Sequence, residues 1–217
     1  MIRGRPLFTT HTSHGTDTPC PGGSLSILEA PRSRLKVKVC LVGESAVGKS
    51  SLIRRYVLDM FDDSYLQTLG AKVSKKSLML PVPRSAPARE VVMTIWDIMG
   101  NSGFQELLKE SYFYGCQGLL AVADVTRRAT LEGLDGWIER AWGVAGEVPV
   151  HFLLNKVDLV RDTDEDVDRV RAFSAAYDAP DAFTSARRGD NVVRAFEDLA
   201  RRILDPRPAN PVLLEAV

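Results

Sequence analysis

The segment GESAVGKS has the residue types and the spacing of a phosphate-binding loop. It fits the pattern GxxxxGK(S/T) and lies between a strand-like run and a helix-like run, as such a loop requires. The glycines let backbone N–H groups face an anion, Lys49 supplies a cation for the β- and γ-phosphate oxygens, and the Ser50 hydroxyl can bind Mg²⁺. A glycine-rich turn with an exposed lysine is the alternative. The predicted phosphate site comprises Gly43, Glu44, Ser45, Ala46, Val47, Gly48, Lys49, Ser50 and Ser51.

A second candidate group is Asp97 with Gly100, at the end of the apolar run TIWDIMG. A carboxylate at the end of a strand can hold a metal-bound water, and a glycine leaves its N–H accessible to a γ-phosphate. Asp and Gly three residues apart are also common in turns, so the pattern indicates a metal and phosphate site only because a phosphate-binding loop lies upstream. We therefore expect Asp97 beside Ser50 at a magnesium ion.

If the phosphates belong to a nucleotide, the run LLNKVDL suggests how the protein recognises the nucleotide base. A carboxylate at Asp158 can accept hydrogen bonds from both N1–H and the exocyclic amine of guanine, whereas adenine presents no such pair of donors. Asn155 can bridge neighbouring loops, and the stem of Lys156 can cover the ring. An ordinary strand-ending turn is one alternative. A P-loop ATPase or kinase is another, which Asp158 disfavours because N1 of adenine is an acceptor.

Taken together, GESAVGKS, WDIMG, NKVD and TSARRGDN resemble the guanine-nucleotide motifs of the Ras-like small GTPases, and the Rab-like group is the most similar. FDDSYLQTLG resembles the first switch of that group. The resemblance implies that Thr68 binds Mg²⁺ and senses the γ-phosphate. It also implies that Tyr65 covers the phosphates and that Phe61 meets guanine edge-on.

The same resemblance places the last base-contacting loop at Ser185 and Ala186, where the alanine N–H reaches the guanine carbonyl and Arg187 replaces the lysine of the family. It covers residues 35–204. It implies an α/β P-loop NTPase fold with a six-stranded, mostly parallel sheet and five helices on both faces. It also implies a cycle between GTP and GDP, with effectors, exchange factors and GTPase-activating proteins that read the two switch loops.

The second switch departs from the family, which usually reads Trp-Asp-Thr-Ala-Gly-Gln. Here Asn101 stands where the family has the glutamine that orients the attacking water. Asparagine is one methylene shorter, so its carbonyl falls about 1.5 Å short, and a misplacement near 1 Å can cost about a hundredfold in rate. The residues expected to act in hydrolysis are Asn101, Thr68, Gly100 and Lys49. We predict slow turnover; the alternative is a GTP-loaded scaffold or sensor with negligible hydrolysis that recruits protein partners.

Other residues near this switch leave two interpretations open. Ile98 and Met99 are bulkier than the Thr and Ala of the family, and they either restrict closure of the switch or fill a gap beneath it. Gln105 either substitutes for the missing glutamine or, as we expect, is an exposed helical residue. Arg127 and Arg128 follow a predicted strand and either lie near the nucleotide end or, as we expect, are solvated.

The elements that would position these residues can be read from hydrophobic periodicity. Strands are predicted at residues 35–42, 71–80, 90–97, 118–125, 148–155 and 181–185, and helices at 49–61, 130–142, 164–176 and 190–203. Asp190 is expected to cap the last helix, which would dock through Val193, Phe196, Leu199 and Ile203. Strand and helix alternation predicts a mostly parallel sheet with helices on both faces.

Composition limits the remaining possibilities. The 217 residues carry a formal net charge of zero, so no broad basic field favours nucleic acid or an anionic membrane. We expect one GTPase domain at 34–204, between a disordered tail at 1–33 and a tail at 205–217. The first tail faintly resembles a transit peptide, but its prolines favour disorder.

Cysteine usage and hydropathy bear on location. Cys20, Cys40 and Cys116 are widely spaced without a CxxC pair, which argues against a disulfide framework and favours a cytoplasmic protein. The three histidines are scattered, so a histidine metal cluster is not expected. No run approaches the roughly 18 apolar residues of a spanning helix. The last residues contain no cysteine for the prenyl anchor of Rab and Ras proteins. We expect a monomer without a direct lipid anchor.

Overall fold

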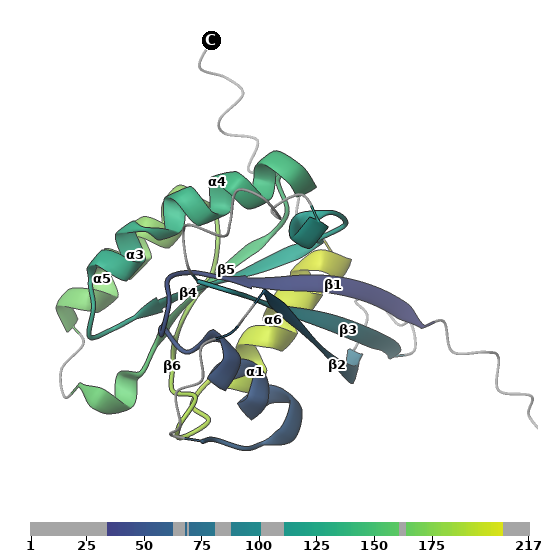
Figure 1. Ribbon diagram of the computed structural model, residues 1–217, viewed down its shortest axis with the longest axis horizontal. Coiled ribbons are helices and arrows are strands. Elements are labelled where there is room, and N and C mark those ends of the chain that lie inside the picture. The colour runs from purple at the N-terminus through teal and green to yellow at the C-terminus, as the bar shows by residue number, and fades with distance from the viewer. Residues whose placement is uncertain are drawn as a thin grey trace, which may run out of the picture. The chain divides into compact units, whose positions relative to one another are not determined.

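A six-stranded sheet in the order β2-β3-β1-β4-β5-β6 is the framework of the protein (Figure 1). The computed structural model describes residues 34–62, 68, 70–80, 88–100, 111–160 and 164–205. The predicted tails before residue 34 and after residue 205 lie outside the described residues, as do the proline-containing loop at 81–87, Tyr65, Asn101 and Gln105.

The strands agree closely with the sequence prediction. Among the described strands, β2 and β3 pair in antiparallel fashion and the other four pairings are parallel, so the expected mostly parallel α/β sheet is confirmed. The strands are β1 Leu35–Val42, β2 Ala71–Leu80, β3 Arg89–Ile98, β4 Gly118–Asp124, β5 Val150–Asn155 and β6 Asp181–Thr184.

Helices cover both faces of this sheet (Figure 1). Helices α1 and α6 share one core cluster, in which the rings of Tyr56 and Phe196 stack at 4.1 Å, and α3, α4 and α5 pack into a second cluster on the other face. No described helix is long and apolar enough to cross a membrane. The helices are α1 Lys49–Leu58, α3 Ala129–Glu132, α4 Leu134–Ala145, α5 Asp164–Ala176 and α6 Val192–Leu204, with a short 3₁₀ turn η2 at Val157–Leu159.

Two predicted helix boundaries were wrong. The helix expected at 130–142 is two helices, α3 and α4, joined at Gly133. The helix expected at 49–61 ends at Leu58, because Asp59 turns into the left-handed region with φ 53° and its N–H bonds to the carbonyl of Arg55. Met60 therefore lies beyond the helix and is 59% exposed.

The start of α6 also differs from the prediction. The helix begins at Val192, after Asn191 with φ 55°, so Asp190 does not cap it. Instead, the Asp190 carboxylate accepts a hydrogen bond from Arg188. Of the predicted docking residues, Phe196 and Leu199 are buried and Ile203 packs against the core, whereas Val193 is 53% exposed and Val192 is buried in its place.

The sheet brings the predicted motifs to one edge. The parallel strands β1, β3, β4 and β5 end there, with Leu41 beside Asp97 and Asp124 beside Asn155 in the strand register. The carboxyl ends of parallel strands are where open α/β sheets bind their ligands. The residues that follow these strands form the site described next.

Candidate functional site

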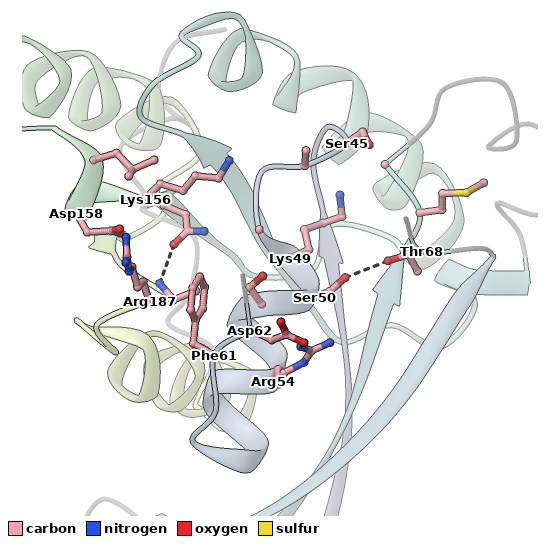
Figure 2. Close-up of a pocket in the computed structure, with 18 of the residues that line it drawn as sticks. Ser45, Lys49, Ser50, Arg54, Phe61, Asp62, Thr68, Lys156, Asp158 and Arg187 are labelled. Atoms are coloured by element: carbon pink, nitrogen blue, oxygen red, sulfur yellow. Dashed lines mark hydrogen bonds and ion pairs between the residues drawn. The ribbon is translucent and has the colours of Figure 1, made fainter. Parts of the chain in front are cut away.

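A pocket at this edge collects most of the predicted site residues (Figure 2). In Figure 2, Lys49, Ser50 and Thr68 lie at one end of the pocket and Lys156, Asp158 and Arg187 at the other. Tyr65 and Asn101 lie outside the described residues, so their positions remain predictions. The predicted residues that line the pocket are Ser45, Ala46, Gly48, Lys49, Ser50, Ser51, Phe61, Thr68, Gly100, Asn155, Lys156, Asp158, Ala186 and Arg187.

Steric constraint explains two glycines of the loop between β1 and α1. Gly43 has φ 132°, and a Cβ built there would lie 2.2 Å from the carbonyl oxygen of Val122 on β4. Gly48 has φ 101°, and its Cβ would lie 2.3 Å from Nδ2 of Asn155. No side chain fits at either position, so both glycines are needed for the loop to pass between its neighbours.

Lys49 is the buried cation of the loop. Its Nζ donates to the carbonyl oxygens of Gly43 at 2.6 Å and Glu44 at 2.8 Å. Burial lowers the pKa of Lys49 to about 8, and the nearby negative charges of Asp97 and Glu44 oppose that shift. The ammonium group is thus held over the loop backbone, where it could meet phosphate oxygens.

Ser50, Thr68 and Asp97 come from three separate segments and gather their oxygen atoms in one place. The hydroxyls of Ser50 and Thr68 lie 3.0 Å apart (Figure 2). Ser50 also donates to Oδ2 of Asp97 at 2.5 Å. Burial raises the pKa of Asp97, while the hydrogen bond from Ser50 and the charge of Lys49 oppose it. The other carboxylate oxygen, Oδ1, is buried without a hydrogen-bond partner among the described residues.

This arrangement fits a hard divalent cation. Two hydroxyls and a carboxylate are the oxygen donors that Mg²⁺ prefers, and the unpartnered Oδ1 of Asp97 gives a buried acceptor that a cation-bound water could satisfy. Within the described ranges, no cluster of three or more His, Cys, Asp or Glu residues offers a competing metal site. We conclude that Ser50, Thr68 and Asp97 could hold Mg²⁺ at the phosphate end of the pocket.

The backbone at Gly100 packs closely against the phosphate-binding loop. A Cβ added there would lie 2.5 Å from the carbonyl carbon of Glu44 and 2.6 Å from the backbone nitrogen of Ser45. The two preceding side chains, Ile98 and Met99, are 3% and 8% exposed, and both also border the pocket. The backbone after β3 can thus approach the loop only because residue 100 has no side chain.

At the other end of the pocket, Asn155 joins three segments. Its Nδ2 donates to the carbonyl of Val47 at 2.9 Å, and its Oδ1 accepts from the hydroxyl of Thr184 and the N–H of Ala186, each at 3.2 Å. The amide is 1% exposed, so these bonds are made away from water. The predicted bridging role of Asn155 between loops is therefore seen directly.

Asp158 is held by the loop after β6. The Ser185 hydroxyl donates to Oδ1 of Asp158 at 2.6 Å. Ser185 is fully buried and lies behind the pocket, whereas Asp158 borders it. The loop is fixed in turn by Arg55 of α1, which donates to the carbonyls of Ala186 at 2.9 Å and Arg187 at 2.7 Å. Arg55 was not foreseen, because its partners are backbone atoms more than a hundred residues away.

Asp124, the last residue of β4, was also missed. Its carboxylate is 1% exposed and accepts hydrogen bonds from Lys156 at 2.6 Å and from Arg127 at 3.1 Å. Burial alone would raise the pKa of Asp124, but hydrogen bonds from Lys156 and Thr126 outweigh it and hold the pKa below its usual value. A carboxylate ending a fully apolar strand at this edge was a signal that could have identified it.

Two more charged residues at the pocket had no sequence signal. Arg54 and Asp62 border the pocket and form an ion pair at 3.0 Å, between α1 and the segment that leads to Thr68 (Figure 2). Arg127 is exposed, as expected, with 44% of its side chain accessible, and its Nη2 also donates to the carbonyl of Ser45 at 2.8 Å. Arg128 also makes an interaction within the protein.

Comparison with known proteins shows what this chain is similar to. The Ras family model matches residues 38–205, from within β1 to the end of α6. The Ras-related protein Rab-1D of Dictyostelium discoideum is 31% identical over 175 residues, which cover 80% of this chain and 82% of the relative. Rab-21 of Geodia cydonium is 31% identical over 178 residues, covering 82% and 75%. Rab-18-B of Danio rerio is 33% identical over 172 residues, covering 77% and 79%.

Proposed function

Because the chain belongs to the Ras family of small GTPases, we propose that it is a guanine-nucleotide switch that binds GTP and GDP with Mg²⁺ and hydrolyses GTP slowly. The observation that carries this proposal is the position of Asp158, whose carboxylate borders the pocket while Ser185 holds one of its oxygens. We assign the function to residues 34–204, and the match at 38–205 supports that assignment.

Guanine would be selected at the Asp158 end of the pocket. A carboxylate accepts hydrogen bonds and donates none, so it complements the N1–H and exocyclic amine of guanine and opposes the N1 acceptor of adenine. Ala186 and Phe61 also border the pocket, which supports their proposed roles against the guanine carbonyl and the ring. The stem of Lys156 is available to cover the ring because its ammonium is tied to Asp124.

The phosphates would lie on the loop from Gly43 to Ser50. Lys49 is placed to neutralise their charge, and the backbone N–H groups of the loop would cradle their oxygens. Mg²⁺, held by Ser50 and Thr68 directly and by Asp97 through water, would neutralise the charge that develops on the transferred phosphoryl group. The chemistry is then positioning and charge stabilisation, with water as the nucleophile.

Slow hydrolysis follows from Asn101 in the second switch. The proposal takes this residue as the one that orients the attacking water through a shortened side chain, next to Gly100 as the γ-phosphate contact. Members of the Ras family act with effectors, exchange factors and GTPase-activating proteins. We propose that such partners read the loops around Thr68 and Gly100 and that one of them accelerates the reaction.

Single-turnover GTP hydrolysis by the wild type and Asn101→Gln tests this function. Restoring the methylene should speed hydrolysis by about ten- to a hundredfold and leave GDP affinity unchanged, because the substitution affects water and not nucleotide binding. Lys49→Ala is the matched control, which should lower affinity for both nucleotides. Equal rates for the wild type and Asn101→Gln would show that the short amide does not limit turnover.

A further inference from the structure

Arg127 links the phosphate-binding loop to the end of β4 at two points. Its Nη2 donates to the carbonyl oxygen of Ser45 at 2.8 Å, and its Nε donates to Oδ2 of Asp124 at 3.1 Å. The Asp124 carboxylate is 1% exposed and is also bonded to Lys156, which fixes it in place. Asp124 therefore fixes the guanidinium group on one side, while Nη2 bonds to the backbone carbonyl of Ser45 in the loop.

The planarity of the peptide bond gives this contact a consequence inside the pocket. In a trans peptide, the Ser45 C=O and the Ala46 N–H point in opposite directions. Ser45 and Ala46 border the pocket, whereas Arg127 is not among the described residues that line it. With its C=O bonded to Arg127 outside the pocket, the peptide directs the Ala46 N–H toward the inside.

The backbone at Ala46 needs such support. Ala46 has φ 61°, a strained left-handed conformation that is uncommon for residues other than glycine. A conformation of this kind persists when neighbouring contacts specify it. The hydrogen bond from Arg127 fixes the orientation of the peptide that precedes Ala46. Because the donor is charged, it also polarises that peptide and makes the Ala46 N–H a stronger donor.

We propose that Arg127 is a positioning residue for the nucleotide phosphates, which holds and polarises the Ser45–Ala46 peptide so that the Ala46 N–H donates to the phosphate chain. This inference rests on the proposed function, since it takes a nucleotide phosphate as the occupant of the loop. Arg127 thus acts from outside the pocket, through one peptide group, and does not contact the nucleotide.

The test uses the full chain loaded with GDP and Mg²⁺, in the wild type, Arg127→Gln and Arg127→Lys. Arg194→Gln is the control, because it removes the same charge from α6, where Arg194 is 79% exposed and pairs with Asp198. Three quantities are measured: the chemical shift of the Ala46 amide proton, the ³¹P shift of the GDP β-phosphate, and the rate of release of a fluorescent GDP analogue. Thermal unfolding of each variant reports whether the fold is retained.

We expect Arg127→Gln to move the Ala46 amide upfield, shift the β-phosphate resonance and speed GDP release by about three- to tenfold, since one charge-assisted hydrogen bond is lost at a half-exposed site. Arg127→Lys should be intermediate, and it carries the test if the glutamine variant does not fold. Arg194→Gln should match the wild type. A purely structural role would lower thermal stability without moving the Ala46 amide or the β-phosphate signal.

The outcomes separate this inference from the proposed function. If the wild type binds GDP and the Arg127 variants leave both signals and the release rate unchanged, the inference is overturned and the proposed function stands. If the wild type binds no GDP, both are overturned.

Discussion

At the end of the pocket that Asp158 borders, here called the base end, protein groups bond to one another. At the end where Ser50, Thr68 and Asp97 gather, here called the metal end, a buried oxygen has no such partner among the described residues. Asn155 makes three hydrogen bonds that join the phosphate loop to the loop after β6, and Ser185 holds Asp158. Asp97 instead keeps Oδ1 buried and unpartnered among the described residues, although Ser50 and Thr68 are both near its Oδ2.

This difference indicates how each end achieves its function. Hydrogen bonds within the protein already orient the groups at the base end, so the proposed discrimination between bases would carry little entropic cost on binding. The metal end collects hard oxygen atoms whose burial is unfavourable until a cation compensates for it. Substitutions at the base end should therefore change which nucleotide is bound, while changes at the metal end should alter how long any nucleotide stays.

The largest effect is expected from Asp158→Asn. An asparagine can donate where the carboxylate accepts, so affinity for GDP should fall by about a thousandfold and xanthine nucleotides should be preferred. Competition between GDP and xanthosine diphosphate against a fluorescent nucleotide measures both changes. Unchanged affinity for GDP would show that Asp158 does not recognise the base.

Removal of Mg²⁺ should have the next largest effect. Chelation with EDTA is expected to speed GDP release from the wild type by about a hundredfold, equivalent to about 3 kcal/mol, because the charge on the phosphates is no longer neutralised. Asp97→Asn should already release GDP quickly in Mg²⁺ and respond much less to EDTA. If EDTA leaves the rate of GDP release from the wild type unchanged, Ser50, Thr68 and Asp97 do not hold a cation.

Ser185→Ala should have a smaller effect on GDP binding. The substitution removes the hydroxyl that fixes Asp158 and leaves the carboxylate itself, so GDP affinity should fall by about tenfold with the preference for guanine retained. Titration with GDP and xanthosine diphosphate separates the two quantities. A loss as large as that of Asp158→Asn would mean that Ser185 does more than orient its neighbour.

The sequence predicted the fold and the pocket motifs well, because both depend on local patterns. Alternation and apolar runs located all six strands, and the glycines, Lys49, Asn155 and Asp158 lie in motifs of fixed spacing. The split between α3 and α4 and the start of α6 at Val192 were missed, since helix ends depend on single residues in unusual conformations such as Asn191.

The contacts that hold the motifs together were not predictable in the same way. Arg55 bonds to backbone carbonyls of residues 186 and 187, and Arg127 bonds to the carbonyl of Ser45. A backbone carbonyl carries no signal in the amino-acid sequence, so only the folded chain shows that these arginines reach the site. From the amino-acid sequence alone, both arginines look like ordinary surface residues.

The central claim is that this pocket selects guanine nucleotides, and competition against a fluorescent GDP analogue in Mg²⁺ tests it most directly. We expect GDP to displace the analogue at a concentration about a thousandfold lower than ADP, because Asp158 would pair with the donors of guanine and oppose the acceptor of adenine. Equal displacement by ADP, or recovery of an adenine nucleotide from the purified protein, would contradict it.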